Sequence, residues 1–557
     1  MTGSVDGSDR VIVIGAGPVG QTGALLLARW GIPVTVVDER PARDLIGSKS
    51  ICQQRDVLDI WEAVGAGRQI ADEGVTWERA RTYYRDQELF CVTFTDRGRS
   101  PFPPFVNISQ SRTEAILDER ITANRLIDVR WGHQVTAIAQ DEDGVTVTCR
   151  TSEGERSLRA AYVLACAGAR GDAVRSMLGL TFGGRTFDDH FLICDIRADL
   201  GDWAHERRFY FDPEWNPGRQ VLIHPCPDST YRIDWQVPGD FDLDTERDSG
   251  RLNERIRQII GDKPYEVVWS SVYRFHARLV DRMCVGRVLV AGDLAHLVAP
   301  FGARGLNSGV PDVENAAWKV AFVMRGWAPP ALLRTYETER VAAASENLAV
   351  TSATMDFLVP QTEAAWARRK EILEQALVDA QARENVNSGR LAEPFWYVDS
   401  PLTTPNPTRV FSGRPPRGET PPVVPGVLVP DAPVSVAGEP GVTRLREIVR
   451  DGLLVLTTGD TAAARAAVSG VTRAPLRVLA LGNIDRTGVL AEALDVRPGE
   501  AWVIRPDGHV AAVVPHDDDR ALAAAVRRSL GMSDESIERT VVSRQRDAVP
   551  SVAAAAE

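Results

Sequence analysis

The 557-residue chain has little lysine, no run of basic residues and no long hydrophobic stretch. An acidic balance, with a formal charge of -12, argues against nucleic-acid binding through bulk charge and against an anionic membrane patch. No apolar stretch reaches the roughly 20 residues that span a bilayer. Residues 1–10 also lack the charged and apolar regions of a signal peptide. We therefore expect a soluble, cytoplasmic protein without membrane or nucleic-acid partners.

Cysteine is also scarce, and its distribution excludes several functions. The seven cysteines are odd in number and widely spaced, with no CxxC and no Cys/His cluster. This pattern favours reduced thiols and argues against a disulfide framework or a metal site. The chain length predicts about three or four domains.

The clearest motif lies near the N-terminus. A β-branched run, Val11–Ile14, leads into the glycine-rich turn 15–20, a helical pattern follows over 21–29, and a second apolar run, 34–37, closes on Asp38. This is a strand–helix–strand unit with GxGxxG at its first turn and an acid after its second strand, an arrangement typical of dinucleotide binding.

Each glycine of this turn has a physical role in such a site. Gly15 allows the tight turn, Gly17 lets the backbone approach a pyrophosphate, and Gly20 lets the helix pack close to the strand. The helix N-terminus offers free N–H groups to the phosphates, and Asp38 can accept hydrogen bonds from a ribose diol.

A second stretch suggests which dinucleotide binds. The buried-strand pattern 288–291 ends at Asp293, and a glycine-rich turn then leads into the helical pattern 313–324. A carboxylate next to a polyol, followed by a helix N-terminus facing the flavin N1–C2=O edge, suits FAD. An ordinary turn in which Asp293 caps a helix is the alternative. No second GxGxxG unit occurs downstream.

Three separated blocks resemble the class A flavoprotein aromatic hydroxylases, the group of para-hydroxybenzoate hydroxylase and phenol hydroxylase. The first block, 15–40, contains GxGxxG. The second, 288–307, contains GDLAH at 292–296 and PFGARGLN at 300–307. The third, 312–340, contains DVENAAWK at 312–319 and YETER at 336–340. The resemblance implies an α/β and α+β fold, with a Rossmann-like FAD-binding domain, an inserted antiparallel β-sheet substrate domain and a thioredoxin-like C-terminal domain.

The resemblance also implies the cofactors and their contacts. FAD would bind tightly but non-covalently, with NADPH or NADH as a transient co-substrate and O2 as oxidant. The residues implied in FAD binding are Gly15, Gly17, Pro18, Gly20, Asp38, Glu39 and Arg40 on the pyrophosphate and adenosine side, Val135 beside the adenine, Gln110 at the flavin, and Asp293, Pro300, Gly302, Gly305, Leu306 and Asn307 along the ribityl chain and isoalloxazine.

One block departs from the family pattern. Many relatives carry D-G-x-x-S-x-V-R, which touches both FAD and the nicotinamide nucleotide. In segment 165–175 the Asp is replaced by Ala167 and the Ser by Gly171, with one residue inserted. Asp172 supplies a carboxylate nearby. The docking of the nicotinamide cofactor and the choice between NADH and NADPH stay open.

Strands with alternating polarity fill residues 183–282. Alternation along 231–237 predicts one face with Tyr231, Ile233 and Trp235 and another with Arg232, Asp234 and Gln236. The resemblance implies that this sheet roofs the flavin. Candidate catalytic residues are Tyr210 and Arg232, which would orient a phenol, and His224, a base that would help to ionise it. Packing or a surface ion pair is the alternative for each.

The C-terminal part begins with a proline-rich segment. Residues 401–433 hold 10 of the 34 prolines, a composition typical of a semi-rigid linker. No cysteine follows Cys284, so the thioredoxin-like domain cannot exchange a dithiol, and we expect a packing or oligomer role, such as in a homodimer. The expected domains are FAD binding, 1–75, 101–182 and 283–400; substrate, 76–100 and 183–282; linker, 401–433; thioredoxin-like, 434–545; and tail, 546–557.

The resemblance implies an NAD(P)H- and O2-dependent monooxygenase that hydroxylates a phenolic or polycyclic aromatic substrate through C4a-hydroperoxyflavin. Baeyer–Villiger or another flavin oxygenation on the same scaffold remains an alternative, as does a non-catalytic flavin-binding protein. A flavin halogenase is disfavoured because Trp235–Pro238 lacks most of the WxWxIP segment, and a disulfide reductase because Cys52 stands alone. The identity of the substrate stays open.

Overall fold

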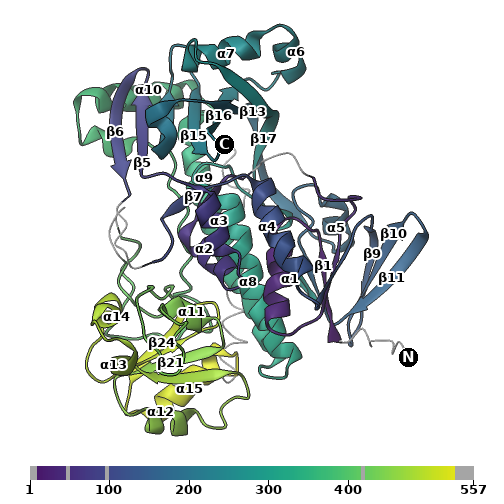
Figure 1. Ribbon diagram of the computed structural model, residues 1–557, viewed down its shortest axis with the longest axis vertical. Helices are drawn as coiled ribbons and strands as arrows, with labels where there is room; N and C mark the ends of the chain where they lie inside the picture. The colour runs from purple at the N-terminus through teal and green to yellow at the C-terminus, as the bar shows by residue number, and fades with distance from the viewer. Residues whose placement is uncertain (1–8, 45–49, 95–99, 416–420, 533–557) are drawn as a thin grey trace. The chain divides into compact units, whose positions relative to one another are not determined.

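The computed structural model describes residues 9–44, 50–94, 100–415 and 421–532 (Figure 1). The chain forms two compact units, which we describe separately. The first contains the described parts of Met1–Arg97, Pro101–Val313 and Ala343–Glu393, and the second contains Glu314–Ala342 and the described part of Pro394–Glu557. The finer domain boundaries given above stay a prediction, and the expected tail, 546–557, lies outside the described residues.

A six-stranded sheet forms the base of the first unit. Its central strands are almost fully buried and rich in Val and Ile, as expected for parallel strands with both faces covered. Strands β19, β12, β1, β2 and β8 are parallel, and β18 pairs antiparallel with β19. The order is β18 (Cys284–Val285), β19 (Val288–Val290), β12 (Tyr162–Ala165), β1 (Val11–Ile14), β2 (Val34–Val37) and β8 (Ile127–Arg130).

Helices of the first unit place the candidate site. Helix α1 packs against β1, β2 and α4, which confirms the expected strand–helix–strand unit. Ser109 caps α4 by accepting a hydrogen bond from the backbone N–H of Arg112 at 3.2 Å. The helices are α1 (Pro18–Arg29), α2 (Arg55–Glu62), α3 (Gly67–Glu73), α4 (Gln110–Thr122), α5 (Asp172–Met177), α6 (Leu243–Asp248), α7 (Arg251–Ile260), α8 (Arg304–Met324), α9 (Arg334–Leu358) and α10 (Glu363–Val378), with the 3-10 turns η2 (Gly201–His205), η3 (Gly292–Leu294) and η5 (Ala382–Asn385).

An eight-stranded sheet is the largest sheet of the unit. Its pairs are antiparallel except for β14 with β5, which run parallel. The order is β20 (His296–Leu297), β17 (Tyr265–Val280), β13 (Phe182–Ala198), β16 (Thr230–Val237), β15 (Gln220–Cys226), β14 (Glu206–Phe211), β5 (Arg79–Tyr84) and β6 (Gln87–Thr93). Two three-stranded sheets complete the unit: β11 (Gly154–Ala160), β10 (Val145–Thr151) and β9 (Gln134–Gln140); and β3 (Cys52–Gln54), β7 (Phe105–Asn107) and β4 (Val75–Thr76).

The two faces of the eight-stranded sheet have different surroundings. Tyr231, Ile233 and Trp235 belong to a core that also contains Leu252 and Ile256 of α7, so we call this side the α7 face. Because side chains alternate along a strand, Arg232, Asp234 and Gln236 lie on the opposite side, which we call the Arg232 face. The predicted alternation of 231–237 is thus confirmed.

The second unit contains a four-stranded sheet. Strand β21 pairs parallel with β22 and antiparallel with β23, and β23 pairs antiparallel with β24, which fits the expected thioredoxin-like fold. Its order is β22 (Leu476–Ala480), β21 (Leu453–Thr457), β23 (Glu500–Ile504) and β24 (Val510–Pro515). Helices α11 (Leu445–Val449), α12 (Thr461–Val468), α13 (Leu481–Ile484), α14 (Val489–Ala493) and α15 (Asp519–Ser529) and the turn η4 (Pro330–Leu333) complete it, together with residues 314–324 of α8 and 334–342 of α9.

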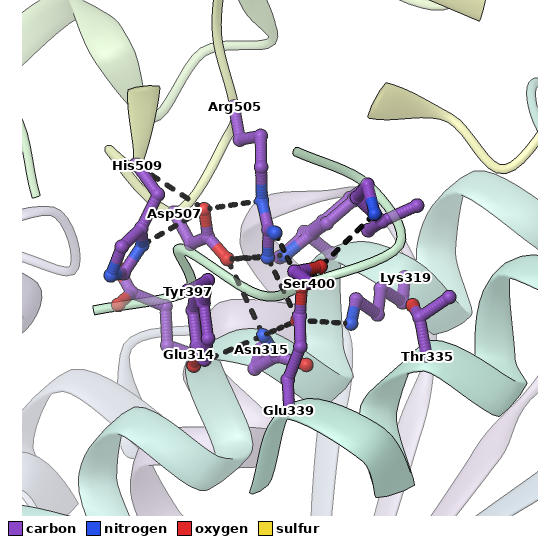
Figure 2. A network of polar contacts seen from close by, with 12 residues as sticks. Glu314, Asn315, Lys319, Thr335, Glu339, Tyr397, Ser400, Arg505, Asp507 and His509 are labelled. Carbon is purple, nitrogen blue, oxygen red and sulfur yellow. Dashed lines mark hydrogen bonds and ion pairs between the residues drawn. The ribbon is translucent and has the colours of Figure 1, made fainter. Parts of the chain in front are cut away.

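A buried ionic network joins these helices to the sheet within the second unit (Figure 2). Arg505, which is fully buried, donates to Glu339 at 2.5 and 3.0 Å and to Asp507 at 2.6 Å. Lys319 donates to the same Glu339 at 2.6 Å. Two cations therefore face two carboxylates in a region without access to water.

The balance of charge keeps the network ionised. Although burial opposes it, the charges of Arg505 and Lys319 lower the pKa of Glu339. Burial lowers the pKa of Lys319 to about 8, against the effect of Glu339. Removing one partner would leave an uncompensated buried charge, which costs more than the pair itself contributes.

We expect Arg505→Met to destabilise the second unit by about 3–5 kcal/mol, because Asp507 then loses its guanidinium partner in the core. The measurement is chemical unfolding of the purified chain followed by tryptophan fluorescence. Arg497→Ala is the control, since Arg497 is 47% exposed and lies 3.7 Å from Asp495; it should change stability by at most about 1 kcal/mol. Equal effects of the two changes would contradict the importance of the network.

No helix within the described ranges is both long and apolar enough to cross a membrane. All seven cysteines lie in these ranges, and none of them forms a disulfide bond with another described residue.

Candidate flavin site

The glycine-rich turn between β1 and α1 has the close approaches that its sequence predicts. Gly15 has φ +102°, and a Cβ atom there would lie 2.4 Å from the carbonyl oxygen of Cys166. A Cβ atom on Gly20 would lie 1.9 Å from the carbonyl oxygen of Gly15. Gly17 differs, because a Cβ atom there would meet no described atom within 4 Å. The backbone at Gly17 thus faces open space in front of α1.

Helix α1 begins at Pro18, with Gly17 as an N-cap that supplies no side-chain hydrogen bond. The first N–H groups of a helix have no partner within the helix and carry its positive dipole end. An anionic group at Gly17 would satisfy both. The turn therefore fits the pyrophosphate of a dinucleotide.

Asp38 anchors the end of β2. Its carboxylate accepts hydrogen bonds from the backbone N–H of Ala16 at 2.8 Å and from the backbone N–H and guanidinium of Arg40, each at 2.9 Å. Burial opposes ionisation, but these hydrogen bonds lower the pKa of Asp38. Glu39 is exposed beside it. In the structure Asp38 holds the glycine turn and Arg40 together; its contact with a ribose stays a prediction.

The segment before β9 lies next to Asp38. The backbone N–H of His133 donates to the carbonyl of Asp38 at 2.8 Å, and that of Gly132 donates to the carbonyl of Arg40 at 2.8 Å. Val135 follows two residues later at the start of β9, where it pairs with Cys149. The structure therefore brings the predicted adenine-side strand close to the predicted ribose-side acid.

A cluster at α4 adds a residue that the sequence reasoning missed. Arg43 donates to the carbonyl of Ala16 at 3.1 Å and to Glu114 at 2.7 Å. Gln110, the predicted flavin-side residue, donates to the same Glu114 at 2.8 Å and accepts from the backbone N–H of Ser50 at 3.1 Å. Arg43 thus links the glycine turn to two carboxylates of α4, Glu114 and Asp118, and no motif in the sequence pointed to it.

Asp293 lies in the turn η3, which the buried pair of Asp312 and His296 holds in place. The carboxylate of Asp312 accepts from the backbone N–H of Gly292 at 2.9 Å and lies 2.7 Å from Nε2 of His296. Asp312 is fully buried, whereas the side chain of Asp293 is exposed. The pair therefore holds the turn so that the Asp293 carboxylate faces outward. Neither Asp312 nor His296 was predicted as a site residue.

Arg175 fixes the same turn from the side. Its guanidinium donates to the carbonyl of Leu294 at 2.9 Å, to that of Asp293 at 3.0 Å and to the Asp172 carboxylate at 2.7 Å. Burial lowers the pKa of Arg175, which is 3% exposed. In the segment that departs from the family motif, the arginine therefore positions the Asp293 turn and Asp172 pairs with it.

The N-terminus of α8 forms the third part of the site. Gly302 has φ +91°, and a Cβ atom there would lie 2.1 Å from the carbonyl oxygen of Arg390, whereas a Cβ atom on Gly305 would meet no described atom within 4 Å. Pro300 is exposed just before the helix, and Leu306 is 9% exposed within its first turn. The backbone at Gly305 therefore faces open space at the positive end of a helix dipole.

The side chain of Asn307, a residue predicted to lie along the flavin, bonds the backbone of neighbouring segments. Its Oδ1 accepts from the backbone N–H of Gln54 at 2.9 Å, and its Nδ2 donates to the carbonyl of Cys52 at 2.9 Å and to that of Ala303 at 2.6 Å. These bonds hold β3 against α8. The contact of Asn307 with a flavin stays a prediction.

These three turns, far apart in sequence, converge in the first unit. A Cβ atom on Gly309 of α8 would lie 2.7 Å from Val19 of α1 and 3.1 Å from the Cα atom of Gly292. A Cβ atom on Gly23 of α1 would lie 3.3 Å from Val313 of α8. The glycine turn, the Asp293 turn and the start of α8 thus form one cradle. Two helix N-termini, open backbone at two glycines and an exposed carboxylate suit the phosphate, polyol and flavin parts of FAD.

The Arg232 face of the eight-stranded sheet carries the candidate catalytic cluster. Arg232 is 2% exposed and donates to both oxygens of Asp195, at 2.8 and 2.9 Å. His224 is directly opposite Arg232 across β15 and β16. Its Nε2 lies 3.8 Å from Oδ2 of Asp234. Within the described residues, His224 Nδ1 and Asp234 Oδ1 are buried without a hydrogen-bond partner.

The cluster has unusual electrostatics. Burial raises the pKa of Asp234 to about 7, although Arg232 opposes the shift. Burial, together with the charges of Arg207 and Arg232, lowers the pKa of His224 well below its usual value. His224 is therefore a neutral imidazole at physiological pH.

Tyr210 does not belong to this cluster. It pairs with Val221, which pairs with Trp235, so its side chain lies on the α7 face. The structure therefore brings His224 and Arg232 together but separates both from Tyr210 by the thickness of the sheet. These three residues cannot surround a single substrate ring.

Apolar contacts connect the Arg232 face to the start of α8. Cys52, Cys226 and Ala303 pack in one cluster, and Ala303 immediately precedes α8. The ring of Phe301 lies 5.4 Å from that of Phe191 and 6.2 Å from that of Phe209. Burial raises the pKa of both Cys52 and Cys226 to about 12, which keeps these thiols protonated and unreactive.

Gln53 on β3 is a further residue that sequence reasoning missed. Its side chain is fully buried, and neither amide atom has a hydrogen-bond partner among the described residues. The adjacent Gln54 has an unpartnered Oε1. Buried amides without partners are rare in proteins. The unpartnered amide atoms of β3, which Asn307 holds against α8, can therefore form hydrogen bonds with a bound ligand.

Comparisons with known proteins identify the family. Residues 9–351 match the FAD binding domain family, and residues 423–533 match the C-terminal family of aromatic-ring hydroxylases. Since the first match covers more than half of the chain, the chain belongs to this family of FAD-binding proteins. The resemblance to the class A FAD-dependent aromatic hydroxylases is confirmed.

Several curated proteins are similar over long stretches. The 3-(3-hydroxy-phenyl)propionate/3-hydroxycinnamic acid hydroxylase of Comamonas testosteroni is 30% identical over 376 residues, which are 66% of this chain and 62% of that protein. The 6-methylpretetramide 4-monooxygenase of Streptomyces rimosus is 29% identical over 90% of each chain. The dialkyldecalin synthase of Streptomyces rugosporus is 30% identical over 92% of this chain and 97% of that protein. The match to the Comamonas hydroxylase therefore spans less than two thirds of that protein.

Solved structures share the fold. The flavin-dependent monooxygenase PieE, in complex with FAD and substrate, has a TM-score of 0.79 at 22% identity and covers 94% of this chain and 99% of its own. Aklavinone-11 hydroxylase, with FAD and aklavinone, has a TM-score of 0.74 at 24% identity and the same coverage. These likenesses confirm the expected fold class.

We expect Gly17→Ala to weaken FAD binding by about tenfold, or ~1.4 kcal/mol, because the new methyl group occupies the space that the pyrophosphate needs. Gly17 has φ -76° and ψ 178°, which alanine adopts freely, so the melting temperature of the FAD-free chain should not change. Flavin fluorescence titration and thermal melting measure the two quantities.

Gly20→Ala is the matched control for this change. Its Cβ atom would clash with the Gly15 carbonyl, so it should lower the melting temperature of the FAD-free chain itself. Unchanged FAD affinity in the Gly17→Ala variant would contradict the assignment of the glycine turn.

Proposed function

We propose that the chain is an FAD monooxygenase that uses NADH or NADPH and O2 to hydroxylate a phenolic or polycyclic aromatic ring. The observation that carries the proposal is the polar cluster of the Arg232 face beside the N-terminus of α8. The matches to named hydroxylases and monooxygenases support it. When bound, FAD supplies the chemistry, by taking electrons from the nicotinamide and activating O2.

The residues of the cradle would hold the cofactor. The backbone N–H groups at Gly17 and in the first turn of α1 would bind the pyrophosphate, and the Asp293 carboxylate would accept hydrogen bonds from ribityl hydroxyls. The N-terminal dipole of α8, at Gly305, would stabilise negative charge on the flavin ring. The backbone faces open space at Gly17 and Gly305, and the Asp293 side chain is exposed.

The Arg232 face would prepare the aromatic substrate. A phenol is much more reactive toward an electrophilic oxygen as its phenolate. His224 is neutral and would accept the phenol proton at its unpartnered Nδ1. Burial, together with the charges of Arg207 and Arg232, lowers the pKa of His224, and the same positive charge would stabilise the phenolate. Arg232 is fixed by Asp195 and would act through its charge.

The direct test is a substrate screen with product analysis. We expect FAD reduction by NADH or NADPH to accelerate with phenols, hydroxyphenylpropionates or larger phenolic polycycles. We expect the product to gain one oxygen on a ring carbon, with the label of 18O2. A ring-expanded lactone would favour Baeyer–Villiger oxygenation instead.

Two further outcomes would overturn the proposal. A product with a new ring but no added oxygen would favour a synthase activity like that named for the relative in Streptomyces rugosporus. A flavin-loaded protein whose reduction no compound accelerates would favour the non-catalytic alternative.

We expect His224→Gln to lower kcat for a phenolic substrate about 100-fold at pH 7, because the phenol loses its proton acceptor. The His224 pKa is lowered, so the wild-type rate should be flat from about pH 7 to 9. The variant rate should instead rise with pH toward the phenol pKa of about 10, where the ring ionises unaided. Parallel pH profiles for the two proteins would contradict a base role for His224.

A further inference from the structure

Tyr210 does not lie on the Arg232 face. Its side chain lines a cavity of about 270 Å³ on the α7 face of the eight-stranded sheet. The cavity lies between β5, β14, the turn η2 and α7. Four of its lining residues are aromatic: Tyr83, Trp203, Tyr210 and Trp215. Since the sheet separates this cavity from His224 and Arg232, it is distinct from the candidate flavin site.

The aromatic rings are arranged for stacking. The rings of Tyr83 and Tyr210 are 4.6 Å apart and nearly parallel, at 11°. Trp215 meets Tyr210 edge-on at 5.5 Å, and the guanidinium of Arg208 lies 4.1 Å from the ring centroid of Trp203. A flat ligand can therefore contact ring faces, ring edges and a planar cation within one small cavity.

The charged groups beside the cavity form a balanced network, in which Arg208 is the one cation that lines the cavity within the described residues. Glu206, which is 3% exposed, faces three guanidinium groups: Arg208 and Arg81 bond it directly, and Arg79 lies 3.7 Å away. Arg81 also pairs with Glu88 at 2.7 Å. Asp86 is a further carboxylate, at the exposed rim of the cavity. With Asp86, three cations face three carboxylates on this part of the sheet.

The hydrogen-bond donors that line the cavity indicate that its ligand carries a hydrogen-bond acceptor. Arg208 donates to the hydroxyl oxygen of Tyr210 at 3.2 Å, which leaves the Tyr210 O–H free to donate onward. No described residue forms a hydrogen bond with the hydroxyl of Tyr83. Burial raises the pKa of Tyr83 to about 12, so this hydroxyl keeps its proton. Two phenolic donors and a guanidinium therefore lie beside the same space.

We propose that this cavity is a second ligand site, which binds a small planar aromatic carboxylate. The stacked rings select a planar ring, the two phenolic O–H groups and the Arg208 guanidinium select a hydrogen-bond acceptor such as a carboxylate, and the volume, slightly below the 300–1,000 Å³ of typical ligand pockets, selects one ring. The proposal does not depend on hydroxylation at the flavin site.

The test measures binding to the FAD-loaded full chain by isothermal titration calorimetry without a nicotinamide cofactor. Benzoate is the probe, with benzamide as a neutral planar control and cyclohexanecarboxylate as a non-planar anion. We expect saturable benzoate binding, weakened about tenfold for each control because one of the two recognition elements is lost. Absence of saturable benzoate binding would overturn the proposal.

Variants locate the bound benzoate. Ile259→Trp fills the cavity from α7, and Arg208→Gln removes the guanidinium while Arg81 still pairs with Glu206. We expect each to weaken benzoate binding about tenfold or more, and His224→Gln to leave it unchanged. Melting temperatures show which variants are folded, and either cavity variant alone suffices for the test.

The opposite pattern would overturn the second site. Benzoate affinity that falls with His224→Gln but not with the cavity variants would place the ligand at the flavin site. Substrate-stimulated flavin reduction is measured separately, so a failure of the proposed hydroxylation would not be mistaken for a failure of this site.

Discussion

The close backbone approach of three turns is the constraint on which the first unit depends. Gly309 leaves no space for a Cβ atom between α8, Val19 of α1 and the Asp293 turn. Gly20 similarly lets α1 approach the Gly15 carbonyl. Only because these positions lack side chains do two helix N-termini and the Asp293 carboxylate meet at one place. The buried pair of Asp312 and His296 then keeps the Asp293 turn in position.

The alternation of side chains in the eight-stranded sheet separates two chemical environments. On one face, buried Arg232 and half-buried His224 and Asp234 lie near the start of α8, where neutral imidazole and positive charge suit the ionisation of a phenol. On the other face, Tyr210 belongs to an aromatic cavity beside α7. A single strand, β14, contributes to both, with Phe209 directed toward Phe301 and Tyr210 directed away from it.

Local patterns in the sequence predicted much of this fold. The run Val11–Ile14, the glycine turn and the alternation of 231–237 depend on neighbours in sequence, so period and spacing suffice to predict them. The positions of Tyr210 and Asn307 depend on strand register and on a contact between β3 and α8. No local signal reports such pairings, which is why Tyr210 was grouped with Arg232 and the bonds of Asn307 to β3 were not predicted.

The positioning residues Arg175, Asp312 and Arg43 were missed for the same reason, because each acts on a turn distant in sequence.

The central claim is that one FAD lies across the three converging turns. A crystal structure of the chain with FAD tests it most directly. We expect density for the pyrophosphate at Gly17 and for the isoalloxazine at the N-terminus of α8. FAD bound elsewhere, or with its flavin ring away from Gly305, would contradict the claim.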